Sequence, residues 1–264
     1  MEEVFARIKR EGDEFRAICL TQGSAGTLGS GEYLKEYHPE IKVAAMEALE
    51  CPTLLYNGYG AHRIEGIGDK HVPWIHNLKN TDLVVDIADE DCMRLLRLFN
   101  EKPGQEYLVK MGLSQELAAS LPLLGISSIA NLLGCIKTAK FYEMDETDVI
   151  FTVATDSEEM YSSRLTELTE ERGAYDADQA AKDYDRCLMG QTVDWMLECG
   201  YWDRRRMHNL KYFTWIEQQG KTLKELNAQW YQKDYWTNRF HAVREWDELI
   251  KEFNERTGLI KKYL

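Results

Sequence analysis

A glycine-rich segment near the N-terminus has the composition of a phosphate-binding loop. Residues 22–27 read QGSAGT and lie between an apolar run typical of a strand and a pattern typical of a helix. Small residues let the backbone approach a ligand closely, and successive N–H groups can then point into one concavity at the positive end of the helix dipole. Ser24 and Thr27 can add hydroxyl donors. The segment therefore predicts a phosphate site, with a tight turn that binds nothing as the structural alternative.

Two nucleotide-binding classes can be compared with this loop. It does not match GxxxxGK[ST], so a P-loop nucleoside triphosphatase is disfavoured. A dinucleotide fold requires GxGxxG after the first strand and an acidic residue about 20 residues further on. Glu47 stands 21 residues after Gly26, so a nucleotide-binding α/β enzyme stays open as an alternative.

The elements that must position this loop follow from apolar runs of strand length. Such runs are typical of strands covered on both faces, and they occur at Phe15–Thr21, Lys42–Ala48, Leu83–Ala88 and Val149–Thr155. Helical patterns separate them, at residues 27–37, 89–100, 114–121 and 127–140. Alternating strands and helices predict an α/β fold with a mostly parallel sheet and flanking helices.

The second part of the chain has a different character. After about Ala154 no strand is predicted, and helices are expected at residues 157–170, 178–199, 203–219, 221–232 and 239–256. Six of the seven tryptophans lie in this part. We therefore expect an α/β domain over residues 1–162 and an aromatic-rich helical extension over residues 163–264. The aromatic side chains are predicted to pack these helices onto the α/β part or a second subunit, with ligand stacking as the alternative.

Composition excludes several classes of protein. Almost all of the net charge of −13 lies in residues 1–160, which disfavours nucleic acid or an anionic membrane as the main partner. No apolar run is long enough to span a membrane, and the charged N-terminus lacks the core of a signal peptide. The six cysteines form no CxxC pair, and neither they nor the histidines have metal-ligand spacing, so no metal is expected. Buried free thiols in the cytoplasm are expected.

Four segments together resemble the fold-type II (β-family) pyridoxal 5′-phosphate enzymes, which include cysteine synthase and cystathionine β-synthase. The family's GTGGT loop is similar to Gly23-Ser24-Ala25-Gly26-Thr27, and its PHKIQGIG segment to HRIEGIG at residues 62–68. Its GISSGA segment is similar to GISS at residues 125–128, and its PDS or CDS to Thr155-Asp156-Ser157. The match covers roughly residues 13–162 and resembles the C-terminal portion of these enzymes only.

The resemblance implies pyridoxal 5′-phosphate as the cofactor and a role for each segment. The implied cofactor-binding residues are Gly23, Ser24, Ala25, Gly26, Thr27, Gly66, Gly68, Ser127, Asp156 and Ser157. The loop would hold the phosphate, and the two glycines of GIG would line the pocket near the substrate. Ser127 would face the pyridine nitrogen, where a neutral hydroxyl suits elimination or replacement at Cβ. Asp156 and Ser157 would close that side of the pocket.

Each of these segments also has a structural alternative. Ser127 stands at a predicted helix start, where serine is an ordinary N-cap. Asp156 and Ser157 precede a second helical pattern and can serve it in the same way. Gly66 and Gly68 can form a turn without a ligand. The loop also departs from the family pattern, because Ser24-Ala25 stand where the family has Thr-Gly, and the Cβ of Ala25 would be unfavourable if that position requires a positive φ.

The family's Schiff-base lysine and its substrate-carboxylate segment lie well upstream of the glycine loop. This chain starts about a dozen residues before the strand that leads into the loop, so both are expected to be absent. One explanation is a split subunit or fragment whose N-terminal half is another polypeptide. The other is a lysine-less paralogue with a binding or regulatory role.

Three functions follow from different classes. The first is the C-terminal half of a pyridoxal-phosphate enzyme for β-elimination or β-replacement in amino-acid metabolism, acting on a small cysteine- or serine-like amino acid. It is not expected to be a complete enzyme alone, and its partner is a second copy or a chain carrying the N-terminal half. The second is a non-catalytic binding or assembly subunit. The third is the nucleotide-binding enzyme considered above.

Overall fold

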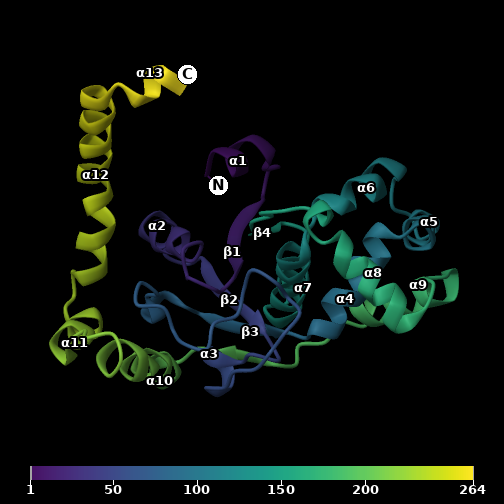
Figure 1. Ribbon diagram of the computed structural model, residues 1–264, viewed down its shortest axis with the longest axis horizontal. Coiled ribbons are helices and arrows are strands. Elements are labelled where there is room, and N and C mark those ends of the chain that lie inside the picture. The colour runs from purple at the N-terminus through teal and green to yellow at the C-terminus, as the bar shows by residue number, and fades with distance from the viewer. Residues whose placement is uncertain (1, 264) are drawn as a thin grey trace. The chain divides into compact units, whose positions relative to one another are not determined.

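The computed structural model describes residues 2–263 (Figure 1). The chain divides into two compact units, the first extending to Leu210 and the second starting at Lys211. The boundary predicted from the sequence, after residue 162, falls inside the first unit.

A five-stranded sheet in the order β4-β1-β2-β3-β5 forms the centre of the first unit. Its strands are β1 (Glu14–Thr21), β2 (Lys42–Ala48), β3 (Leu83–Ile87), β4 (Asp148–Phe151) and β5 (Met196–Glu198). The pairs β1–β2, β1–β4 and β2–β3 are parallel, and β5 is antiparallel to β3. The four predicted strands are confirmed, although β4 ends at Phe151 instead of continuing to Thr155.

The apolar runs become strands because both faces of the sheet are covered. Along β1, Ile18 and Cys19 are fully buried on opposite faces, in two separate apolar clusters. Met46 of β2 belongs to the same cluster as Cys19, and Val43 of β2 to the same cluster as Ile18. A strand with two covered faces needs apolar residues at successive positions, which is the pattern the sequence shows.

The helices of the first unit are α1 (Glu2–Ile8), α2 (Gly29–Tyr37), α3 (Thr53–Tyr56), α4 (Asp89–Asn100), α5 (Lys102–Lys110), α6 (Gln115–Ser120), α7 (Ile126–Phe141), α8 (Ser162–Arg172), α9 (Ala177–Tyr184) and α10 (Tyr201–Lys211), whose last residue opens the second unit. They include those predicted before residue 150, with small shifts at their ends, and also α1, α3 and α5, which the sequence patterns do not predict. Helix α7 contacts β1, β2 and β3 and packs against α4, and α7 is buried along much of its length. The α/β class predicted from the sequence is confirmed.

The helix predicted over residues 178–199 is wrong in its second half. Helix α9 and a π-helical turn, Asp185–Met189, end before Gly190. Trp195 then adopts a positive φ of 52°, and β5 pairs with β3 through Met196, Leu197 and Glu198. A three-residue strand carries too little alternation to be recognised, and its place in the sheet depends on a partner more than 100 residues away.

The second unit is helical. After a π-helical turn, Tyr212–Ile216, it contains α11 (Leu223–Tyr231), α12 (Tyr235–Thr257) and α13 (Leu259–Tyr263). Thr222 caps α11 by a reciprocal pair of hydrogen bonds with Glu225. Gly258 ends α12 in the left-handed conformation. Across residues 2–263 no single helix is long and apolar enough to cross a membrane; α6 extended to Leu123 and α7 pass that test only as a pair bent by 119°.

Candidate functional site

The glycine-rich loop leaves β1 at the carboxyl edge of the sheet and leads into α2 (Figure 1). Ala25 adopts the left-handed conformation at φ 63°, and its side chain is buried against apolar neighbours. None of the N–H groups from Gly23 to Thr27 donates a hydrogen bond to another residue of the described chain. A turn through the left-handed region with unused N–H groups is the geometry of an anion-binding nest.

The glycines of residues 66–68 lie directly against this loop. The Gly68 N–H donates to the Gln22 carbonyl at 3.1 Å, and a Cβ on Gly23 would lie 3.4 Å from the Gly66 carbonyl oxygen. Gly66 and Gly68 have φ of 83° and 80°, a region that favours glycine. The structure therefore brings together two segments that are about 40 residues apart in the sequence.

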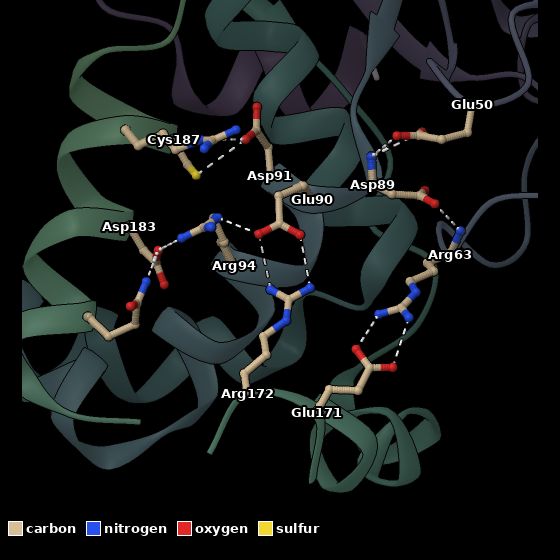
Figure 2. Close-up of polar contacts among 12 residues, drawn as sticks. Glu50, Arg63, Asp89, Glu90, Asp91, Arg94, Glu171, Arg172, Asp183 and Cys187 are labelled. Carbon is tan, nitrogen blue, oxygen red and sulfur yellow. Dashed lines mark hydrogen bonds and ion pairs between the residues drawn. The ribbon is translucent and has the colours of Figure 1, made fainter. Parts of the chain in front are cut away.

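Carboxylates around the first turn of α4 hold the segment that carries these glycines (Figure 2). The Asp89 carboxylate accepts the N–H groups of Arg63 at 2.6 Å and Ile64 at 3.2 Å. The Arg63 guanidinium forms a bidentate pair with Glu171 of α8, at 2.8 and 2.9 Å. Glu65 pairs with Arg164 of the same helix. Helices α4 and α8 thus hold the three residues that directly precede the glycines.

Asn131 ties α7 to the strands that lead to the site. It is buried, and its side-chain oxygen accepts the Thr21 N–H at 2.8 Å while its amide group donates to the Val153 carbonyl at 2.9 Å. Ser127 lies one turn earlier on the same face of α7. Its hydroxyl is 3.4 Å from the Thr155 hydroxyl. Asn131 therefore places Ser127 at the carboxyl edge shared by β1 and β4.

The segment after β4 packs against the start of α7. The Gly125 N–H donates to the Asp156 carbonyl oxygen at 2.9 Å, and a Cβ on Gly125 would lie 2.2 Å from an Asp156 carboxylate oxygen. Tyr161 donates a hydrogen bond to the Asp156 carboxylate, and burial together with that bond raises the pKa of Tyr161. The residues corresponding to the family's GISS and PDS segments thus lie side by side.

Neither Ser127 nor Ser157 makes a capping hydrogen bond, although Ser157 stands at the N-cap position of a short 3-10 turn. Gly125 occupies the N-cap position of α7, so Ser127 stands inside the first turn. Ser157 precedes a short 3-10 turn, Glu158–Met160, and its side chain makes no capping hydrogen bond. The hydroxyl of Ser128 is buried and has no partner among the described residues. The serine hydroxyl groups of these segments therefore do not cap a helix.

Glu47 belongs to a buried polar cluster and not to an open site. Its carboxylate accepts the N–H groups of Leu54 and Leu55 of α3 at 2.9–3.0 Å. Asp86 is its partner in register on β3, and burial followed by the charge of Glu47 raises the pKa of Asp86. Burial lowers the pKa of Lys137, whose ammonium donates to the Asp86 carbonyl at 3.0 Å. Since Glu47 is engaged, it is not available to bind a ribose.

These residues suit a small phosphorylated cofactor. The N–H groups of the loop can satisfy phosphate oxygens, and the exposed hydroxyls of Ser24 and Thr27 lie on the same loop. The Ser127 hydroxyl, which is neutral, can face a ring nitrogen without adding charge. The donor set at the loop therefore fits pyridoxal 5′-phosphate.

Comparison with known proteins also finds cysteine synthases among the relatives of this chain. The chain is 31% identical over 142 residues to cysteine synthase B of Campylobacter jejuni, covering 53% of this chain and 40% of the relative. It is 30% identical over 154 residues to a probable cysteine synthase of Bacillus subtilis, covering 58% of this chain and 44% of the relative. No family model matches the chain.

The matched part, 53–58% of the chain, is similar to cysteine synthases. The resemblance to the fold-type II enzymes that the motifs indicate is thereby confirmed. The chain spans less than half the length of these relatives. The fold agrees with that of a cysteine synthase structure from Entamoeba histolytica, with a TM-score of 0.52 and 24% identity over 71% of this chain and 48% of that chain.

Several residues that shape the site have no distinctive sequence signal. Gln22 is fully buried, and its side-chain amide donates to the Gly23 carbonyl at 3.2 Å while its amide oxygen has no partner among the described residues. From the sequence, Asp89 is expected only as an acidic residue in the first turn of a helix, and it does lie there. Its carboxylate also holds the 62–68 segment through the Arg63 N–H. For Asn131 the only signal is a polar residue within an apolar helix.

Proposed function

We propose that this chain provides the phosphate-binding part of a pyridoxal 5′-phosphate enzyme that catalyses β-elimination or β-replacement on a cysteine- or serine-like amino acid. The observation that carries the proposal is the loop from Gly23 to Thr27, whose N–H groups have no acceptor in the described chain. The similarity to cysteine synthases supports the same conclusion.

Each segment of the site has its own task in this proposal. The bound cofactor supplies an electron sink that makes the substrate Cα–H acidic. The loop binds the phosphate, and the turn through Gly66 and Gly68 lies directly beside it. Ser127 offers a neutral hydroxyl to the ring nitrogen, oriented by Thr155 at 3.4 Å. Asp156 closes the same side, held by Tyr161 and by the Gly125 N–H.

We further propose that the lysine that binds the cofactor covalently comes from outside the described residues. The buried lysine of the first unit, Lys137, serves another purpose, since its ammonium is bound by the Asp86 carbonyl and by the Asp194 carboxylate at 3.3 Å. The lysine and the substrate-carboxylate site then belong to a second polypeptide or to a longer form of this protein.

The first experiment measures cofactor binding by the chain alone. We expect pyridoxal 5′-phosphate to raise the unfolding midpoint, because a ligand that binds only the folded state stabilises it. Gly26→Asp places a negative charge in the loop and should weaken binding at least tenfold. Ala119→Asp, at an exposed position of α6, is the matched control and should bind normally. A midpoint that responds to NAD but not to pyridoxal 5′-phosphate would instead support a nucleotide-binding enzyme.

The second experiment tests where the lysine comes from. Borohydride treatment of the chain with pyridoxal 5′-phosphate should leave no cofactor on Lys137 in peptide mass spectra. After addition of a polypeptide carrying the N-terminal half of a cysteine synthase-like protein, the label should appear on that polypeptide. Stoichiometric labelling of one lysine in this chain alone would contradict the split arrangement.

A further inference from the structure

Helix α12 carries a long apolar stripe on its surface. The helix has 23 residues and none of them is buried. Val243, Trp246, Ile250 and Phe253 are 43%, 51%, 56% and 58% exposed. Their spacing of three, four and three residues puts them on one face of the helix, as in the seam of a coiled coil. Single exposed apolar residues are ordinary, but a continuous stripe of this kind marks an interaction surface.

The start of α12, before the stripe begins, is held within its own unit. The Trp236 indole N–H donates to the Gln229 carbonyl of α11 at 2.9 Å. The ammonium of Lys211 lies 5.5 Å from the centre of the Trp236 ring and donates to the Gln229 side chain at 2.8 Å. An isolated helix is only marginally stable in water, so a helix of this length gains stability from a packed apolar face.

The charge of α12 is divided along its length. Residues 235–244 contain two arginines, Arg239 and Arg244, and no acidic residue. Residues 245–257 contain five acidic and two basic residues, and Glu252 and Glu255 stand in its last turns. Negative charge near a helix C-terminus opposes the helix dipole, so this distribution does not stabilise the helix on its own. It does complement a second helix of the same sequence that runs in the opposite direction.

We propose that two copies of this chain associate through the apolar stripe of α12 as an antiparallel pair of helices. An overlap centred on Glu248 places Val243 opposite Phe253 of the second copy and Trp246 opposite Ile250. The basic first half of each helix then faces the acidic second half of the other. A parallel pair would set Arg239 against the Arg239 of the other copy and acidic half against acidic half, which is unfavourable.

Light scattering of the full chain tests the association. We expect a particle of twice the chain mass of 30.7 kDa, which dissociates on dilution. Ile250→Glu puts a charge in the stripe and should raise the dissociation constant at least tenfold. Lys251→Glu changes the next residue, which lies outside the apolar stripe, and should leave the dimer intact. A monomer at all concentrations, or a dimer that Ile250→Glu does not weaken, overturns the proposal.

Cross-linking tests the direction of the pair. In the antiparallel arrangement Arg239 lies opposite Thr257 of the second copy, so a mixture of Arg239→Cys and Thr257→Cys chains should form disulfide-linked heterodimers under mild oxidation. The native cysteines are buried or half-buried, and the wild-type chain serves as the blank. Efficient linking of Arg239→Cys to itself would show a parallel pair and contradict the proposal.

Charge reversal gives a second measurement that does not depend on cysteine. Arg239→Glu with Arg244→Glu makes the whole helix acidic, and Glu252→Lys with Glu255→Lys makes its second half basic. Each double variant alone should be mostly monomeric, and an equimolar mixture should recover the dimer. If both variants remain dimeric when measured separately, the interface lies elsewhere.

Discussion

Among single residues, Gly68 excludes a side chain for two separate reasons, its backbone conformation and a neighbouring ring. Its φ of 80° lies in the left-handed region, and an added Cβ would come within 2.2 Å of the His62 imidazole nitrogen Nε2. Gly66 has nearly the same φ, 83°, but an added Cβ there meets nothing within 4 Å. The two glycines therefore separate the cost of backbone conformation from the cost of a collision.

Alanine at each position should measure these two costs. Gly66→Ala is expected to lower the free energy of unfolding by about 1 kcal/mol, which is the conformational penalty alone. Gly68→Ala should lower it by about 3 kcal/mol, since His62 must also move. Urea unfolding of both variants gives the difference directly. Equal losses would mean that the His62 ring moves aside at no cost.

Asp86 makes the stability of the protein depend on pH. Burial and the neighbouring Glu47 raise the pKa of Asp86 to about 9, whereas an exposed aspartate in the unfolded chain titrates near pH 4. Between these values the folded state binds a proton that the unfolded state releases. Stability from this residue is therefore complete at about pH 4 and is lost as the pH rises towards 9.

Replacing Asp86 with asparagine should remove this dependence. Asp86→Asn keeps the shape of the side chain and has no proton to lose. The variant is expected to match the wild type near pH 4 and to be more stable above pH 7, with a gap that widens by up to about 1.4 kcal/mol per pH unit. Thermal unfolding of both proteins across pH 4–9 measures this difference in stability. A gap independent of pH would show that Asp86 does not hold a proton in the folded protein.

Between elements, the main polar connection at the site is made by one side chain of α7. Asn131 links the end of β1 to the segment after β4, through Thr21 and Val153. Removing it leaves a backbone donor and a backbone acceptor without partners, and each unpaired buried group costs about 1–3 kcal/mol.

The corresponding prediction compares two asparagines on helices. Asn131→Ala should lower the free energy of unfolding by about 2 kcal/mol or more and should weaken cofactor binding, because Ser127 is no longer fixed. Asn238→Ala, at an exposed position of α12, should change stability by less than about 0.5 kcal/mol. Chemical unfolding and a cofactor titration read out the two effects. Normal cofactor binding in Asn131→Ala would show that Ser127 is held by other contacts.

The sequence predicts those elements whose signal is local. Four strands follow from continuous apolar runs, and α4 is predicted with its observed bounds, because acidic residues stand at its start and apolar residues recur along it. The short β5 carries no such signal, since its conformation comes from pairing with β3. The motif segments could be found from glycine and serine spacing. The residues that bring them together, Asn131 and Asp89, act through tertiary contacts that no local pattern reports.

For the whole molecule, the division of the chain at Leu210 follows from where the core lies. The larger apolar cluster includes Leu168, Tyr175, Ala180 and Cys187, all of which come after residue 162. Helix α9 also contacts α4 and α5. The helical segment directly after residue 162 therefore completes the core of the α/β unit.

Two truncations distinguish the boundary at residue 162 from that at Leu210. A chain of residues 1–210 should unfold cooperatively. A chain of residues 1–162 lacks β5 and the core residues of α8 and α9, and it should bind the dye ANS and lose its cooperative transition. Circular dichroism and ANS fluorescence provide the comparison. A cooperatively folded 1–162 chain would support a domain boundary after residue 162.

The order of the strands also limits where a further strand can be added to the sheet. In the described chain β4 and β5 stand at the two ends, and each has one row of backbone groups that faces no other strand. Such rows are templates for strand addition. A second polypeptide that extends this sheet must therefore enter beside the four residues of β4 or the three of β5. Proline scanning of those two strands would show whether either edge takes up a further strand, without any knowledge of the chemistry.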